Sequence, residues 1–154
     1  MMKPKKEKKE EHYYEYLFLL FATIVFLDRI TKTFLGNGCY SVFCIEKAVN
    51  SGAAFGILPG MTWFFIAIAA IILASVLLFI NEFSGTGKLA LVFIAAGTAA
   101  NMIDRVFFSH VIDIFSVFGS SSFNLADLSN TIGGIMLVVL ILKGNILYKN
   151  KKKI

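Results

Sequence analysis

The chain has 154 residues, of which 57% are hydrophobic and 16% are charged, and its mean hydropathy is +0.74. An ordinary soluble domain is less apolar than this and carries about a quarter of charged residues. The formal net charge is +5, and most of the lysines lie near the two ends of the chain. The composition therefore excludes an average soluble domain and predicts an integral membrane protein.

Four apolar stretches have about the length, roughly 20 residues, that crosses the hydrocarbon core of a bilayer. They cover residues 16–35, 61–80, 89–108 and 126–147. Together they take up more than half of the chain and leave two tails, one turn at 81–88 and two loops. We therefore predict a single domain, residues 1–154, of the all-α membrane class with four transmembrane helices.

The lysines flank the first and the last predicted span. Five lie at positions 3–9 and four at 149–153, whereas the loops at 36–60 and 106–125 contain only Lys47. Cytoplasmic segments carry the excess of lysine and arginine, so we expect both termini to be cytoplasmic and the two loops to lie outside. Because topology accounts for the basic tails, nucleic acid is not an expected partner.

The two outer loops differ in pattern. Residues 36–60 are rich in aromatic and branched residues and are then broken by glycines and Pro59, which predicts a small sheet on the outer surface. The second loop contains the run Val-Ile-Asp-Ile-Phe at 111–115, where we expect a short amphipathic or re-entrant segment. Cys39 and Cys44 fit no metal or redox motif, and we interpret them as small buried hydrophobic residues, with a disulfide as the open alternative.

Four carboxylates lie inside or at the ends of apolar segments, where an ionised side chain costs about 3 kcal/mol on insertion scales. With the predicted topology, all four lie near the outer membrane boundary. Asp28 can pair with Lys32 four residues on, and Arg105 beside Asp104 can extend to the interface, so a structural role stays open for both. The four residues are Asp28, Asp104, Asp113 and Asp127.

Asp113 and Asp127 have no cation within four residues along the chain. Two carboxylates held close in a low-dielectric site cannot both ionise easily, so they share one proton at neutral pH. An aspartic hydrolase needs this state, because the ionised partner takes a proton from the attacking water while the protonated partner binds the scissile carbonyl. The residues favour Asp113 and Asp127 as a catalytic pair, with solvated loop-end carboxylates as the alternative.

Five separated blocks follow one another along the chain. They read Asp-Arg-Ile-Thr-Lys at 28–32, Asn-Ser-Gly-Ala-Ala-Phe-Gly at 50–56, Gly-Thr-Ala-Ala-Asn-Met-Ile-Asp-Arg at 97–105, Val-Ile-Asp at 111–113 and Phe-Asn-Leu-Ala-Asp at 123–127. In this order they resemble the bacterial lipoprotein signal peptidases (signal peptidase II). The resemblance covers almost the whole chain, with two departures: Val49 stands where that family usually has arginine, and Ala100 where it usually has glycine.

The resemblance implies a peptidase of the bacterial cell membrane that cleaves diacylglyceryl-modified prolipoproteins just before the lipidated cysteine, with its site at the outer face. It implies Asp113 and Asp127 as the catalytic pair, in agreement with the choice made from the residues alone. It further implies residues that line the site or hold the substrate backbone, and residues that support them. The first group is Asn50, Gly52, Asn101, Arg105 and Asn124, and the second is Asp28, Lys32 and Asp104.

Other functions remain open. Intramembrane Asp and Lys residues also form ion pathways, so a small proton- or cation-coupled transporter or channel subunit is a second hypothesis, and an inactive homologue that binds lipidated peptides is a third. His110 is the only histidine beyond the N-terminal tail, and no serine-peptidase or zinc-peptidase motif occurs. We expect no cofactor and no metal, and a monomer surrounded by membrane lipid.

Overall fold

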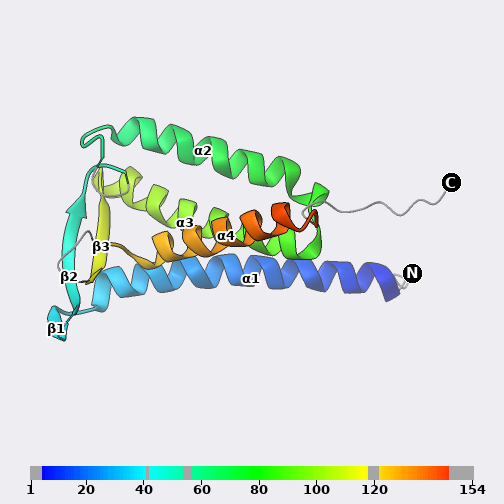
Figure 1. Cartoon of the computed structure of the whole chain (residues 1–154), viewed down its shortest axis with the longest axis horizontal. Helices are drawn as coiled ribbons and strands as arrows, with labels where there is room; N and C mark the ends of the chain where they lie inside the picture. The colour runs from blue at the N-terminus through cyan, green and yellow to red at the C-terminus, as the bar shows by residue number, and fades with distance from the viewer. Residues whose placement is uncertain (1–4, 41, 54–56, 118–121, 146–154) are drawn as a thin grey trace.

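The computed structural model consists of a helical bundle with a small sheet at one end (Figure 1). It describes residues 5–40, 42–53, 57–117 and 122–145, so the lysines at 149–153, Gly56 and the Gly-Ser-Ser segment at 119–121 lie outside the described residues. α1 begins and α4 ends at the end of the bundle opposite the sheet. In chain order the elements are α1 (Lys5–Phe34), β1 (Gly38–Tyr40), β2 (Phe43–Asn50), α2 (Thr62–Phe79), η2 (Ile80–Glu82), α3 (Gly85–Phe108), β3 (Val111–Val117) and α4 (Leu125–Leu142).

Three helices of the described part of the chain are long and apolar enough to cross a membrane, namely α2 together with η2, α3 and α4. They correspond to the predicted spans at 61–80, 89–108 and 126–147. Large apolar side chains stay exposed on all three, including Trp63 (82%), Phe107 (75%) and Leu142 (81%), as expected for residues that face lipid. α4 ends at Leu142, and Gly144, with φ of +64°, turns the chain out of the helix, whereas the predicted end of the last span at 147 lies outside the described residues.

α1 is a helix of 30 residues that contains most of the predicted first span, 16–35. No proline occurs between Pro4 and Pro59, so nothing in the sequence interrupts its backbone hydrogen bonds. Asp28 and Lys32 lie one turn apart near its C-terminal end, which is the end that adjoins the sheet. α1 therefore brings its charged residues to the level at which the sheet meets the bundle.

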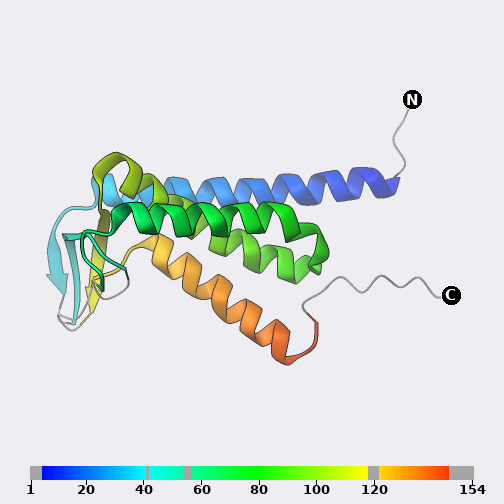
Figure 2. The same ribbon diagram turned by 90° about the horizontal axis from the view of Figure 1, so that it is seen from above.

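α3 and α4 make the most extensive helix–helix contact of the described structure. Two glycines allow their backbones to approach: a Cβ added to Gly97 would lie 2.3 Å from Ala126 O, and one added to Gly133 would lie 2.6 Å from Ala90 O. α4 lies beside α1 near the sheet and diverges from it further along, as Figure 2 shows. The close contact at Gly97 therefore fixes the start of α4 against α3.

Gly97→Ala is expected to lower the free energy of unfolding by about 1 to 3 kcal/mol, because the new methyl group forces α3 and α4 apart. Thermal unfolding in detergent micelles measures this change. Gly134→Ala is the matched control, since nothing lies within 4 Å of a Cβ added there and alanine favours the helix. Equal unfolding temperatures for the two variants would contradict the close packing at Gly97.

The strands form an antiparallel sheet in the order β1-β2-β3. β1 and β2 confirm the small sheet predicted for residues 36–60. The expectation of an amphipathic or re-entrant segment at 111–115 is wrong, because these residues belong to β3, which pairs with β2 so that Asp113 lies opposite Ala48. A short apolar run does not by itself distinguish a strand from a helical segment, and here the free edge of β2 accepts it as a strand.

Cys39 and Cys44 form a disulfide, so their interpretation as two small hydrophobic residues is wrong. The β1–β2 hairpin places the two residues directly opposite each other. The alternative that the sequence left open is therefore the correct one, and the disulfide closes the hairpin that precedes Asn50.

Candidate active site

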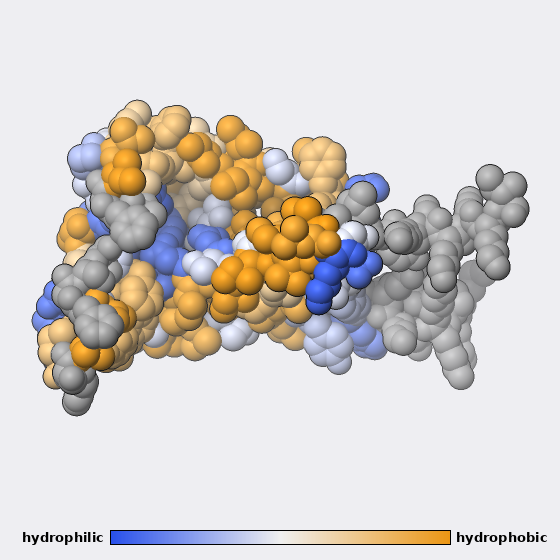
Figure 3. Space-filling model, in the orientation of Figure 1, coloured by the Kyte–Doolittle hydropathy of each residue, from blue (hydrophilic) through white to orange (hydrophobic). Residues whose placement is uncertain are grey.

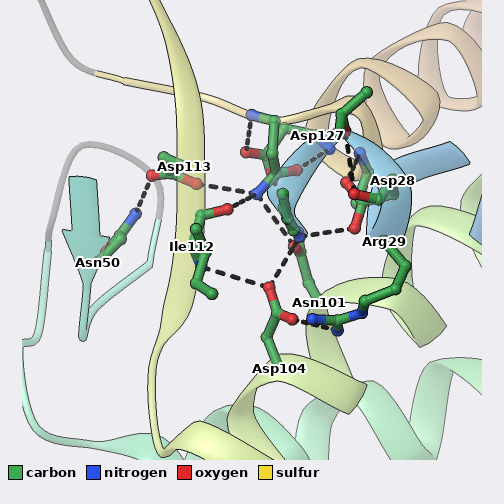
Figure 4. Close-up of polar contacts among 12 residues, drawn as sticks. Asp28, Arg29, Asn50, Asn101, Asp104, Ile112, Asp113 and Asp127 are labelled. Atoms are coloured by element: carbon green, nitrogen blue, oxygen red, sulfur yellow. Dashed lines mark hydrogen bonds and ion pairs between the residues drawn. The ribbon is translucent and has the colours of Figure 1, made fainter. Parts of the chain in front are cut away.

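Asp113 lies in β3 and is 2% exposed. Asn50, the last residue of β2, donates a hydrogen bond from Nδ2 to Asp113 Oδ2 over 3.1 Å. Asn124 donates from Nδ2 to Asp113 Oδ1 over 2.8 Å. Each carboxylate oxygen of Asp113 therefore binds one side-chain amide, an arrangement visible at the left of Figure 4.

Asn124 and Asp127 form the N-terminal cap of α4. Asn124 Oδ1 accepts from Asp127 N over 2.8 Å, and Asp127 Oδ2 accepts from Asn124 N over 3.1 Å, which is a capping box. Asn124 is fully buried, whereas Asp127 is half-buried. Because the same Asn124 side chain also binds Asp113, one asparagine connects the two aspartates while it caps the helix.

Asn101 in α3 connects Asp127 to α1. Its Nδ2 donates to Asp127 Oδ1 over 2.8 Å. Its Oδ1 accepts from Asn124 Nδ2 over 3.1 Å and from Lys32 Nζ over 3.3 Å. The partners on both sides fix the orientation of the Asn101 amide, so Lys32 helps to hold the group that holds Asp127.

Asp28, Arg29, Lys32 and Asp104 form an ion cluster beside the two aspartates (Figure 4). Lys32 Nζ lies 2.6 Å from Asp28 Oδ2 and 2.7 Å from Asp104 Oδ2, and Arg29 Nη2 pairs with Asp104 Oδ1. Asp28 and Asp104 are 0% exposed and Lys32 is 2% exposed. Two cations balance two carboxylates, which is the condition for burying such charges at this level of the bundle.

The ion cluster also binds two backbone amides. Asp28 Oδ1 accepts from Ala126 N over 3.0 Å, at the first turn of α4. Asp104 Oδ2 accepts from Ile112 N over 3.2 Å, next to Asp113 in β3. The cluster therefore fixes the backbone beside each of the two aspartates, which explains how residues of α1 can position a site formed by α4 and β3.

Arg105 completes the site on the side of α2. Its Nη2 donates to Gly52 O over 2.9 Å, and its Cζ lies 5.0 Å from the centre of the Phe65 ring. Gly52 N in turn donates to Asn50 Oδ1 over 3.0 Å, which is a turn closed by an asparagine side chain. Arg105 therefore anchors the loop that carries Asn50 and, through Asn50, supports Asp113.

The electrostatic environment separates the two aspartates from the ion cluster. Burial, and then the negative charge of Asp127, raise the pKa of Asp113 to about 6 against the opposing effect of the hydrogen bonds from Asn50 and Asn124. Within the described ranges, neither Asp113 nor Asp127 forms an ion pair.

Figure 3 shows hydrophilic surface at this end of the bundle, in a hollow between α2 and the start of α4.

The raised pKa predicts a pH dependence of stability. In the unfolded chain an aspartate releases its proton near pH 3.9, whereas folded Asp113 keeps it up to about pH 6. Its contribution to stability is therefore complete below about pH 4 and is lost as the pH rises through 6, by at most about 3 kcal/mol. We expect the free energy of unfolding of the wild type to fall more steeply between pH 4 and pH 8 than that of Asp113→Asn, measured in detergent micelles. Parallel pH profiles would contradict the raised pKa.

All ten residues predicted for the site are connected by the contacts described above. Arg29 belongs to the ion cluster but was not singled out by the sequence analysis, although an arginine inside an apolar segment was a usable signal. The pairing of Asp28 with Lys32 is confirmed. Arg105 donates to Gly52 O, and Arg29 is an ion-pair partner of Asp104. Extension of Arg105 to the membrane interface stays a prediction.

Outside the site, an apolar hollow of about 540 Å³ lies between α2, η2 and α3, and none of the ten site residues lines it. Among the described residues, no group of three or more His, Cys, Asp or Glu side chains is placed to hold a metal ion. Independence of activity from metals stays a prediction that chelation must test.

The fold and the site define a small membrane protein in which two buried or half-buried aspartates, without cation partners in the described structure, stand beside a balanced ion cluster. The family model for signal peptidase (SPase) II matches residues 20–143. The chain therefore belongs to the signal peptidase II family, and the resemblance noted from the five sequence blocks is confirmed.

Relatives and solved structures agree with this assignment. The chain is 36% identical over 142 residues to a lipoprotein signal peptidase of Brevibacillus brevis, with 82% of this chain and 95% of that protein covered. It is 40% identical over 151 residues to one of Staphylococcus aureus, covering 88% and 91%. It also resembles a solved structure described as a bacterial membrane enzyme, with a TM-score of 0.78, 30% identity and coverage of 91% and 93%.

Proposed function

We propose that this chain is an aspartic endopeptidase that removes signal peptides from diacylglyceryl-modified prolipoproteins by cutting before the lipidated cysteine. The observation that carries the proposal is the connection of Asp113 and Asp127 through Asn124, in a site where neither carboxylate has a cation partner among the described residues. Family membership and the names of the relatives support the substrate class.

The two aspartates act as an acid and a base. Asp127, which is half-buried, is the ionised partner and takes a proton from water as the water oxygen attacks the scissile carbonyl carbon. Asp113, whose pKa is raised by burial, holds the shared proton and donates a hydrogen bond to the carbonyl oxygen as it becomes negative. Exclusion of water by the bound substrate raises this pKa further and favours the protonated form.

The tetrahedral intermediate then breaks down with the proton balance restored. The carbon–nitrogen bond before the lipidated cysteine breaks, and its nitrogen receives the proton that Asp127 took from water. The carbonyl reforms, and Asp113 keeps its proton for the next cycle. Asn124 and Asn101 keep the two carboxylates in place throughout, because their amides bind both of them.

The proposed membrane arrangement has four spans, with both termini in the cytoplasm and the site at the outer face. α1 carries three charged residues in its apolar part, but its Asp28, Arg29 and Lys32 lie in the balanced ion cluster, so the cost of placing α1 in lipid is reduced. The sheet, with its Cys39–Cys44 disulfide, lies at the end of the bundle away from the described chain ends. A disulfide persists in the oxidising compartment outside the cytoplasm.

Accessibility labelling tests this topology. Single cysteines are introduced at Glu46 in the sheet and at Thr86 in the first turn of α3, in a variant with Cys39 and Cys44 replaced by alanine, and the two positions lie at opposite ends of the bundle. In intact bacterial cells a membrane-impermeant thiol reagent is expected to label the first position and to spare the second until the membrane is opened. Labelling of the second position alone would place the site at the cytoplasmic face.

Cleavage of a purified diacylglyceryl-modified prolipoprotein tests the proposed function. Mass spectrometry is expected to give a product that begins with the lipidated cysteine, and the unlipidated precursor serves as the control substrate. The rate is expected to stay the same after exhaustive chelation with EDTA. Loss of cleavage with EDTA and its return with Mg²⁺ or Zn²⁺ would instead indicate a metal-bound water as the nucleophile.

A further inference from the structure

Asn130 lies in α4 three residues after Asp127, so the two side chains share one face of the helix. α4 runs from the sheet into the bundle (Figure 1), and three residues of helix advance about 4.5 Å. Asn130 is therefore about one turn deeper in the bundle than Asp127, and like Asp127 it is half-buried. A polar side chain at this depth in an apolar helix requires partners for its hydrogen-bonding groups.

The carbonyl end of the Asn130 side chain is held by α3. Oδ1 accepts a hydrogen bond from Thr98 Oγ1 over 3.3 Å, and a Cβ added to Gly97 would lie 2.7 Å from Oδ1. Gly97 therefore leaves the room that this carbonyl occupies, and Thr98 fixes which end of the amide faces α3. Among the described residues, none accepts a hydrogen bond from Asn130 Nδ2, so the donor end of the amide is left for another molecule.

The face of α4 that carries Asn130 is open beyond this residue. Gly134 follows four residues later on the same face, and nothing lies within 4 Å of a Cβ added there. The hydrophilic surface in Figure 3 reaches the start of α4 from the sheet end of the bundle. An extended chain that leaves Asp127 along α4 would therefore meet Asn130 next.

We infer that Asn130 Nδ2 binds a backbone carbonyl of the signal peptide, one or two residues upstream of the scissile bond. This inference rests on the proposed function. The peptide must leave the helical conformation to reach the two aspartates, and its carbonyls then lose their partners at a depth where water is scarce. An extended chain advances about 3.3 Å per residue, so the offset of about 4.5 Å between Asp127 and Asn130 corresponds to one or two residues.

The test measures kcat/KM of the purified full-length chain on a synthetic diacylglyceryl lipopeptide. In three analogues, one of the three peptide bonds upstream of the scissile bond is replaced by a trans-alkene, which removes the carbonyl without adding charge. With the wild type, one analogue is expected to lose about tenfold, the value of one hydrogen bond. With Asn130→Leu, kcat/KM on the all-amide substrate is expected to be about tenfold below the wild-type value. The analogue that was sensitive with the wild type is then expected to be cleaved by Asn130→Leu as fast as the all-amide substrate.

Two controls separate substrate binding from helix packing. Thr98→Val keeps the shape of the side chain but removes the hydroxyl that orients the amide. With this variant, the loss in kcat/KM caused by the sensitive analogue is expected to fall from about tenfold to about threefold. Asn130→Ala replaces Asn130→Leu if the leucine lowers the unfolding temperature. Equal losses on every analogue for the wild type and for the Asn130 variants would overturn the inference, because Asn130 would then serve only its contact with Thr98. Failure of the proposed function is distinct, since the wild type would then leave the all-amide substrate uncut.

Discussion

Asp113→Asn and Asp127→Asn are each expected to reduce single-turnover cleavage of a diacylglyceryl-modified prolipoprotein by about 10⁴-fold or more, while the folded protein still binds the substrate. Asparagine preserves the size of the side chain, but its amide can neither take a proton from the attacking water nor supply the acidic proton of a carboxyl group. Asn124 contacts both aspartates and holds each in its own position, so one carboxylate cannot move to take over the role of the other.

A carboxylate outside the site provides the control for this prediction. Glu46→Gln makes the same kind of change, from acid to amide, at an exposed position of β2, and it is expected to leave cleavage unchanged. Each variant is checked for folding by its unfolding temperature and for binding by competition with unlabelled substrate. Cleavage near the wild-type rate by folded Asp127→Asn would refute its role as the base, and an inactive homologue or a transporter would then become the better hypothesis.

Lys32→Met is expected to lower the free energy of unfolding by about 3 to 5 kcal/mol. Methionine has nearly the length of lysine, but it removes the ammonium group that lies 2.6 Å from Asp28 Oδ2 and 2.7 Å from Asp104 Oδ2. Both carboxylates are 0% exposed, so the loss leaves negative charge buried with Arg29 as the remaining cation of the cluster. Unfolding of the purified protein in detergent micelles measures the effect.

Lys47→Met is the matched control for Lys32→Met. Lys47 is exposed in β2 and donates to Thr33 O over 3.1 Å, so its replacement is expected to change the free energy of unfolding by no more than about 0.5 kcal/mol. The double variant Lys32→Met, Asp28→Asn is expected to be more stable than Lys32→Met alone, because it removes one of the uncompensated charges. Equal stability of Lys32→Met and Lys47→Met would contradict the structural role of the ion cluster.

The residues of the site were predictable because apolar segments make charged and amide side chains conspicuous. An aspartate within a span has a high cost, so Asp28 and Asp104 required partners, and the topology placed them near Asp113 and Asp127. The choice of partner was less accessible. Whether Asp104 binds Arg105 or Arg29 depends on how α1 and α3 are rotated toward each other, which no local pattern contains.

The sheet was only half predictable for a related reason. The turn residues and aromatic residues of 36–60 indicated β1 and β2 locally. β3 is a strand because it pairs with β2, which lies more than sixty residues earlier in the chain, and no local pattern contains that pairing. The disulfide likewise depends on the hairpin register that sets Cys39 opposite Cys44. Asn124 looked like either a helix cap or a site residue, and the structure combines the two roles.

The double variant Asp113→Asn, Asp127→Asn tests the central claim most directly, because the two aspartates are proposed to act as one unit. Its single-turnover cleavage rate is compared with the rates of the two single variants on the same diacylglyceryl-modified prolipoprotein. If the aspartates share one proton and one reaction, the double variant is expected to be scarcely slower than the slower single variant. Losses that multiply, so that the double variant is slower by the product of the two single effects, would contradict a catalytic pair and would assign the two residues independent roles.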